Sequence, residues 1–138
     1  MLKLLQFSVQ NVHLCIDLQY IERVLPLVLL EKVPNSPIYL AGLMNLRGKS
    51  IPVVDLAIRL GLMRDQPYSL HTPILLCSDH QHLVGLIVDQ IYGMVDADEK
   101  NIQMQEEFGG NLPPYLGAFT FNAGISLLIN TSQIMDFS

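Results

Sequence analysis

The stretch Leu40–Leu62, LAGLMNLRGKSIPVVDLAIRLGL, decides how this chain folds. Its apolar and β-branched residues predict two strands, Leu43–Arg47 and Ser50–Val54, because such residues fit a half-buried pleated sheet. The pair between them, Gly48-Lys49, can adopt the dihedrals of a tight turn. The sequence therefore predicts a β-hairpin at the centre of the chain.

A short helix is predicted directly after the hairpin. Asp55 lies where its side-chain oxygen can accept hydrogen bonds from the free N–H groups of a helix over Leu56–Leu60. Gly61 follows at the position where a left-handed residue ends a helix. Both ends of this helix are therefore specified by the sequence.

Short strands are predicted on both sides of this stretch. Period-two alternation predicts a hairpin that turns at Gln10-Asn11, and apolar runs predict strands buried on both faces at Pro73–Cys77 and Leu83–Val88. Gly85 leaves room for a bulky side chain or a second backbone. The chain is also predicted to contain a single turn begun by Ser36-Pro37, a bent strand over Ile91–Val95, a charged connector over Asp96–Gln105, a loop over Glu106–Pro114, a hairpin of Leu116–Phe121 and Ile125–Ile129, and a terminal helix capped by Asn130.

One further helix is predicted before Leu40. Asp17 can cap it, and Leu18, Ile21 and Leu25 then lie on one side at helical spacing until Pro26 ends it. Many short strands with only short helices indicate a mainly β barrel architecture rather than a parallel sheet.

The composition favours a protein that contacts other proteins. Of 138 residues, 50% are hydrophobic and only 15% are charged, so some apolar surface is expected to be covered by partners. A net charge of −5 supplies no basic field for nucleic acid. The longest apolar run, Val24–Leu30, is broken by Pro26 and is far shorter than the roughly 20 residues that span a bilayer. The start, MLKLLQF, shows no secretion signal, so a cytoplasmic protein without membrane insertion is expected.

The sequence of the central stretch resembles the signature of the CheW-like domain. The resemblance is carried by Asn45-Leu46-Arg47-Gly48 and then Ile51-Pro52-Val53-Val54-Asp55-Leu56. It extends along nearly the whole chain, through Phe7-Ser8-Val9, Ile16-Asp17, Val84–Asp89 and Leu127–Asn130. The resemblance implies a single domain over residues 1–138, made of two small five-stranded SH3-like β-barrel subdomains packed together, with a few short helices.

The same resemblance implies a function. CheW-like proteins are adaptors of bacterial chemosensory arrays, where they couple the cytoplasmic tips of methyl-accepting chemoreceptors to the regulatory domain of a CheA-type histidine kinase. The chain is therefore expected to be a non-enzymatic adaptor without a cofactor, serving a flagellar, a pilus or another chemosensory system. The alternative from a different class is a small-ligand binding β module.

The central turn is the first candidate surface for partner binding. In the family, the arginine that matches Arg47 lies at the surface used for coupling, and Asn45, Gly48 and Lys49 surround it here. The alternative for Arg47 is structural, because a guanidinium can remain solvated or can bind neighbouring carbonyl groups and hold the turn.

The segment after Asp17 is the second candidate surface. Ile21 is either a contact residue or an ordinary core residue. Where the family commonly has an acidic residue two positions later, this chain has Arg23, and its acid, Glu22, is displaced by one position. Compared with the family, the charge at this contact is therefore reversed.

Three other motifs each lack a feature that ligand binding needs. Gly42–Ser50 resembles a phosphate-binding loop, but five residues rather than four separate the glycines, and a strand instead of a helix follows. Asp96–Asp98 begins a calcium-loop pattern in which Asn101 replaces the glycine of the sharp turn. His80 and His82 flank one residue of an exposed turn, a pair that more often contacts water than a functional metal ion.

Nothing in the sequence indicates catalysis. No serine or cysteine lies in a recognisable nucleophile motif. Cys15 and Cys77 lie far apart in apolar strand patterns and fit neither a disulfide framework nor a metal pair. We therefore predict two buried free thiols and no catalytic or metal site.

Overall fold

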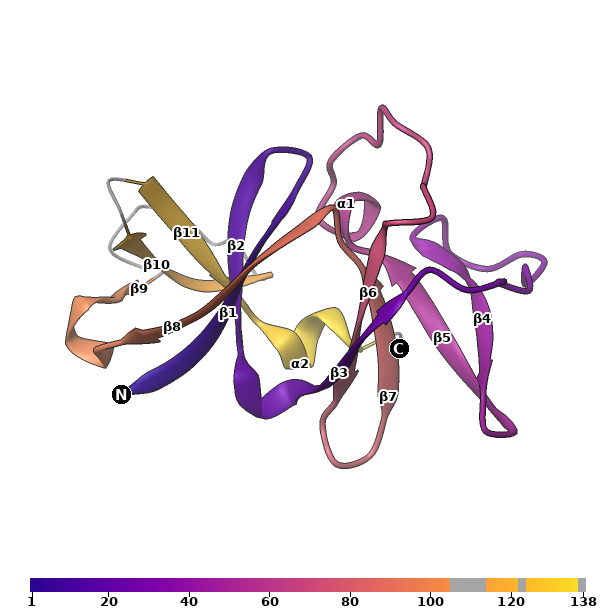
Figure 1. Cartoon of the computed structure of the whole chain (residues 1–138), viewed down its shortest axis with the longest axis horizontal. Coiled ribbons are helices and arrows are strands. Elements are labelled where there is room, and N and C mark those ends of the chain that lie inside the picture. Colours follow the sequence, from indigo (N-terminus) through magenta and orange to yellow (C-terminus); the bar gives the residue numbers. More distant parts are fainter. Residues whose placement is uncertain (105–113, 122–123, 137–138) are drawn as a thin grey trace.

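A computed structural model describes residues 1–104, 114–121 and 124–136, and these residues form two β-sheets joined by short helices (Figure 1). In the described residues the first sheet has six strands in the order β8-β1-β2-β11-β10-β9. Its strands are β1 (Leu2–Val9), β2 (Val12–Asp17), β8 (Gln90–Ala97), β9 (Gln103–Met104), β10 (Tyr115–Phe121) and β11 (Gly124–Ile129). Strand β2 pairs with β11 in parallel, and the other pairs are antiparallel.

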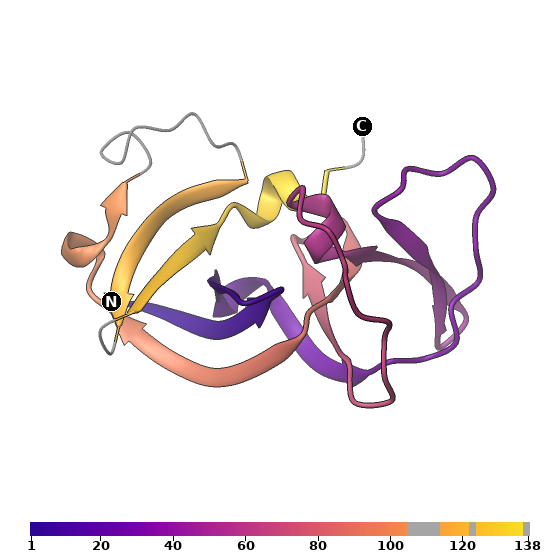
Figure 2. The ribbon, with the colours of Figure 1, turned by 90° about the horizontal axis from the view of Figure 1, so that it is seen from above.

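The second sheet is formed by the middle of the chain. In the described residues it has five strands in the order β3-β6-β7-β5-β4, with β5 parallel to β7. Its strands are β3 (Ile21–Pro26), β4 (Leu40–Leu46), β5 (Lys49–Asp55), β6 (Pro73–Ser78) and β7 (Leu83–Ile87). Figure 2 shows the two sheets side by side, with α1 (Leu56–Arg59) and α2 (Thr131–Ile134) at their junction. Two 3₁₀ helices, η1 (Leu18–Tyr20) and η2 (Glu99–Asn101), complete the set of described helices.

Three apolar clusters form the core. One belongs to the first sheet and contains Leu4 and Phe119, and another belongs to the second sheet and contains Met44 and Ile74. The third is built by both sheets and both α-helices. Its fully buried side chains include Phe7, Leu14, Ile16, Leu56, Leu75, Leu86, Ile129 and Ile134. The predicted mainly β fold with a few short helices is confirmed, with β9 as a sixth strand in the first sheet.

The central stretch forms the predicted hairpin, but the predicted turn is wrong by one residue. Leu46 pairs with Lys49, so the turn consists of Arg47-Gly48 rather than Gly48-Lys49. Both turn residues have positive φ, 52° and 84°, which matches the twist of a two-residue hairpin. Asn45 Oδ1 accepts a hydrogen bond of 2.9 Å from the Gly48 N–H. Arg47 thus adopts a left-handed conformation that costs a non-glycine residue about 1 kcal/mol.

The predicted helix caps are confirmed. Asp55 caps α1 by accepting from the N–H groups of Ala57 and Ile58, and Gly61 follows the helix with φ of 79°. Asn130 caps α2 at its N-terminus. In the described part of the chain, no helix has the length and apolarity needed to cross a membrane.

The predicted helix after Asp17 is wrong. Asp17 caps only η1, and the chain then continues as β3, an edge strand that pairs with β6. Apolar residues at helical spacing gave the prediction, but Ile21 and Val24 are β-branched and fit a strand equally well. The backbone hydrogen bonds that β6 offers decide in favour of the strand.

Two predictions about connections also need correction. Ser36 does not cap a turn, because its hydroxyl donates to the Val33 carbonyl at 2.7 Å, although the Pro37 carbonyl still accepts a turn hydrogen bond. The predicted connector Asp96–Gln105 contains the end of β8, η2 and β9. The predicted loop Glu106–Pro114 lies outside the described residues except for its last residue.

A buried polar network links the loop after α1 to both sheets. The Asp55 carboxylate is 1% exposed and accepts from Arg64 Nε at 2.6 Å and from the Tyr68 hydroxyl at 2.5 Å. Arg64 Nη1 also lies 3.1 Å from Asp89 Oδ1, and Asp89 Oδ2 accepts from the Gln10 backbone N–H at 2.6 Å. Burial opposes the charge of Arg64, but its two carboxylate partners raise the pKa of its guanidinium. The network therefore joins the central hairpin to the β1–β2 turn.

Both cysteines are buried free thiols, as predicted. Burial raises the pKa of Cys15 and of Cys77 to about 12, and the thiolate is the reactive form. We expect neither thiol of the native protein to react with a disulfide reagent at pH 8, and both to react after unfolding in guanidinium. Rapid release of the reagent's coloured thiolate on mixing with the native protein would contradict this prediction.

Candidate functional site

One end of the five-stranded sheet carries an open groove of about 330 Å³. The start of β3, the β6–β7 turn and the β4–β5 hairpin contribute to it, and both turns lie at the lower edge of Figure 1. The groove has an apolar floor of leucine side chains and a polar rim. The leucines are buried or half-buried and form the floor, whereas the polar lining residues are exposed, apart from the half-buried Ser78, and form the rim. The floor is Leu46, Leu76 and Leu83, and the rim is Glu22, Arg23, Lys49, Ser78, His80, Gln81 and His82.

A β-bulge brings both charged residues of β3 to the groove. Ile21 pairs with Cys77 and Arg23 pairs with Leu76, so Glu22 is an extra residue on this edge strand. A bulge of this kind bends the strand and redirects its side chains. Glu22 and Arg23 both line the groove, whereas Ile21 is half-buried and packs against the core shared by the two sheets.

The β4–β5 turn places one cation on the rim and another beside it. Lys49 lines the groove, and Arg47 is exposed at the adjoining turn. The Arg47 side chain forms no ion pair or hydrogen bond with another described residue, and the turn is held by Asn45 and Gly48 instead. The alternative in which the guanidinium holds the turn is therefore not what the structure shows.

The β6–β7 turn orders the third side of the groove. The Asp79 carboxylate accepts from the backbone N–H groups of His82 at 2.8 Å and Gln81 at 3.1 Å. These hydrogen bonds lower the pKa of Asp79. The ordered turn holds His80 and His82 on the rim. Among the described residues, no three His, Cys, Asp or Glu side chains are grouped so that they could hold a metal ion.

The structure brings part of the predicted partner-binding surface together and adds further residues to it. Glu22, Arg23 and Lys49 meet in one groove although β3 is an edge strand and β5 lies three strands away from it in the sheet order. The leucine floor was missed, because an apolar residue in a strand is read as core. The rim histidines were considered only as metal ligands, and no local signal marks them as neighbours of Arg23.

A second recess, of about 490 Å³, lies on the six-stranded sheet. Gln6 donates to Ser126 at 3.3 Å in its wall, and His13 stacks on Tyr92 with ring centroids 5.4 Å apart. The described residues that line it include no Asp, Glu, Lys or Arg. Most of its exposed lining is apolar, and His13 is the one titratable imidazole among the described residues that line it.

The described residues thus form two packed β-sheets with a groove lined by two turns and an edge strand. A family model of the CheW-like domain matches residues 3–137. The chain therefore belongs to the CheW-like domain family.

Curated relatives and a solved structure agree with this assignment. The chain is 28% identical over 110 residues to the probable chemotaxis protein CheW of Rhizobium etli, covering 80% of this chain and 70% of the relative. It is 30% identical over 110 residues to the chemotaxis protein CheW of Thermotoga maritima, covering 78% and 72%. The crystal structure of the scaffolding protein TtCheW from Thermoanaerobacter tengcongensis superposes with a TM-score of 0.84 at 26% identity, covering 94% of this chain and 88% of that one.

Proposed function

We propose that this protein is a non-enzymatic, cytoplasmic adaptor that couples methyl-accepting chemoreceptors to the regulatory domain of a CheA-type histidine kinase. The family and the names of its relatives support a role in chemotaxis signalling. The receptor and kinase partners determine whether the protein serves a flagellar, a pilus-based or another chemosensory system.

The observation that carries this proposal is the exposed Arg47 at the tip of the central hairpin. A two-residue turn of this type favours Asn or Gly at both positions, yet an arginine occupies the first with φ of 52°. Its guanidinium forms no hydrogen bond, ion pair or ring contact with another described residue. A residue that is strained and has no internal partner suggests selection for an external contact.

We also propose that residues 1–138 form a single domain of two small β-barrel subdomains. In support, each sheet has its own apolar cluster, and a third, larger cluster takes side chains from both sheets. Shared burial of this kind is typical of subdomains that fold together rather than of independent domains.

A binding assay with purified components tests the proposed coupling. The chain is mixed with receptor cytoplasmic fragments and with the kinase regulatory domain from the same genome, and complexes are followed by calorimetry. We expect both to bind. Binding of neither, together with a thermal shift by a small neutral compound, would favour the small-ligand alternative and the recess near Tyr92.

Charge reversal at Arg47 should separate binding from stability. We expect Arg47→Glu to change the free energy of unfolding by less than about 0.5 kcal/mol, because the side chain is exposed. Affinity for the kinase or receptor fragment should fall roughly thirtyfold, the scale of about 2 kcal/mol for an interface arginine. Calorimetry and thermal unfolding measure the two effects.

Two variants control this experiment. Arg47→Asn removes the guanidinium and suits the left-handed conformation, so it should weaken binding while raising stability by up to about 1 kcal/mol. Lys100→Glu reverses an exposed charge on η2 and should leave both quantities unchanged. Unfolding of Arg47→Glu would show a structural role for Arg47, and unchanged binding by both Arg47 variants would remove it from the interface.

A further inference from the structure

The groove carries cations on an otherwise acidic protein. Arg23 and Lys49 lie on its rim and Arg47 on the adjoining turn, so three of the eight Lys and Arg residues gather at this end of the sheet. The whole chain has a formal net charge of −5. A local patch of opposite sign steers a complementary partner to one face and repels a partner of the same sign.

These cations have no anionic partner within the described fold. Neither Arg23 nor Lys49 forms an ion pair or side-chain hydrogen bond with another described residue. Glu22 lies on the same rim and also forms no ion pair there. The Asp79 carboxylate, in the nearby turn, accepts hydrogen bonds from N–H groups of its own turn. The two rim cations are therefore available to an external carboxylate.

The floor adds a second requirement. Leu46, Leu76 and Leu83 give the groove an apolar base beneath the charged rim. A side chain that covers leucines gains from apolar burial, while a polar side chain would lose its water contacts there.

We infer that this groove binds an acidic protein segment, which inserts one apolar side chain over the three leucines and places carboxylates beside Arg23 and Lys49. The inference rests on the proposed function in so far as the groove is taken to be a partner surface, and it names the chemistry of that partner. The bulge at Glu22 contributes by presenting Arg23 to the groove from an edge strand.

Three short synthetic peptides test this inference in NMR titrations of the full chain. The first has a central leucine flanked by glutamates, the second has the same leucine flanked by lysines, and the third has a serine between the glutamates. We expect the first peptide to shift the amide signals of Ser78 and Leu83 and to bind about tenfold more tightly than either of the others.

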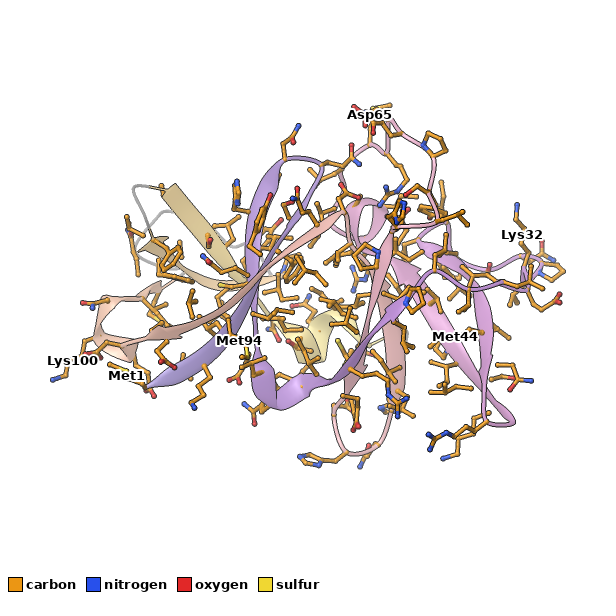
Figure 3. The ribbon with its side chains drawn as sticks, viewed as in Figure 1. Met1, Lys32, Met44, Asp65, Met94 and Lys100 are labelled. Carbon is orange, nitrogen blue, oxygen red and sulfur yellow. The ribbon has the colours of Figure 1, made fainter. Side chains whose placement is uncertain are left out.

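A pair of double variants locates the effect. Arg23→Glu with Lys49→Glu should abolish the preference for the acidic leucine peptide. Lys32→Glu with Lys100→Glu changes the net charge equally, and these lysines lie at opposite ends of the molecule (Figure 3). This control should retain the preference. Arg23→Gln with Lys49→Gln removes the cations without adding anions and should reduce the preference by a smaller factor.

The outcomes separate the inference from the proposed function. Equal binding of the acidic and basic leucine peptides, or equal loss in the two charge-reversed variants, would overturn the inference. Self-association of the free chain that Arg23→Glu with Lys49→Glu abolishes would assign the groove to a second copy and would also overturn it. Failure of the kinase and receptor fragments to bind, with the acidic preference intact, would contradict the proposed function alone.

Discussion

Replacing Asp55 with alanine should lower the free energy of unfolding by about 3–5 kcal/mol, the scale measured when one partner of a buried ion pair is removed. The carboxylate is 1% exposed and Arg64 is 13% exposed, so the guanidinium would keep its charge without its closest partner. The Tyr68 hydroxyl would lose the carboxylate that accepts its hydrogen bond, and α1 would lose its N-terminal cap. Urea unfolding followed by circular dichroism measures the loss.

Matched variants divide this effect into its parts. Asp17 caps η1 near the surface without an arginine partner, so Asp17→Ala should cost only about 1 kcal/mol, the usual scale for a cap. Combining Asp55→Ala with Arg64→Leu should recover part of the loss, because no unpaired charge remains buried. Equal losses in Asp17→Ala and Asp55→Ala would show that capping alone explains Asp55.

The position of Asp55 connects the hairpin that carries Arg47 to the rest of the fold. Its carboxylate begins α1 and binds Arg64, and Arg64 reaches Asp89, whose other oxygen accepts from the β1–β2 turn. The far end of the same hairpin carries the exposed Arg47. One end of the hairpin is thus fixed to both sheets, while the other end exposes the turn and Lys49, where we propose that a partner binds.

Local signals predicted the elements that local chemistry controls. Gln10-Asn11 forms the predicted two-residue turn with φ of 49° and 65°, because Asn11 tolerates left-handed dihedrals, although Gln10 adopts one as Arg47 does. Asp55 and Asn130 cap helices because their short polar side chains reach free N–H groups. Gly85 was predicted to allow a close approach, and a Cβ there would lie 2.9 Å from Ile74 Cγ2.

Tertiary pairing decided the elements that were predicted wrongly. The apolar spacing after Asp17 satisfies a helix of one or two turns, but so short a helix has little stability of its own. Strand β6 offers backbone pairing to β3 along most of its length, with a bulge at Glu22. The central turn was predicted one residue too late, at Gly48-Lys49 instead of Arg47-Gly48, because an arginine at positive φ is rare. The register of the pairing between β4 and β5 determines where the turn lies.

The candidate site could be predicted only in part, because its parts come from distant segments. The family resemblance indicated Arg47, Glu22 and Arg23, but no spacing rule places β3 beside a hairpin two dozen residues away. Strand order brings them to one end of the sheet. The network around Arg64 was missed entirely, since a lone arginine in a polar loop gives no local sign of burial.

Replacing Phe7 with alanine should destabilise the protein by about 3–5 kcal/mol, the usual cost of removing a fully buried aromatic ring. Phe7 is 0% exposed and lies in the cluster that both sheets share. Since a domain of this size has a total stability of roughly 5–15 kcal/mol, the variant should be close to unfolding at 37 °C. Thermal unfolding measures the loss, and residue-specific hydrogen exchange shows which strands are affected.

The location of the lost protection tests whether the two sheets are one cooperative unit. Because Phe7 belongs to β1 but contacts the shared cluster, its removal should reduce exchange protection in β6 and β7 of the second sheet as much as in β2 of the first. Phe121→Ala is the control, since that ring is 37% exposed and its loss should cost much less. Reduced protection confined to the first sheet would mean that the sheets unfold independently, and the proposed single domain of two subdomains would have to be abandoned.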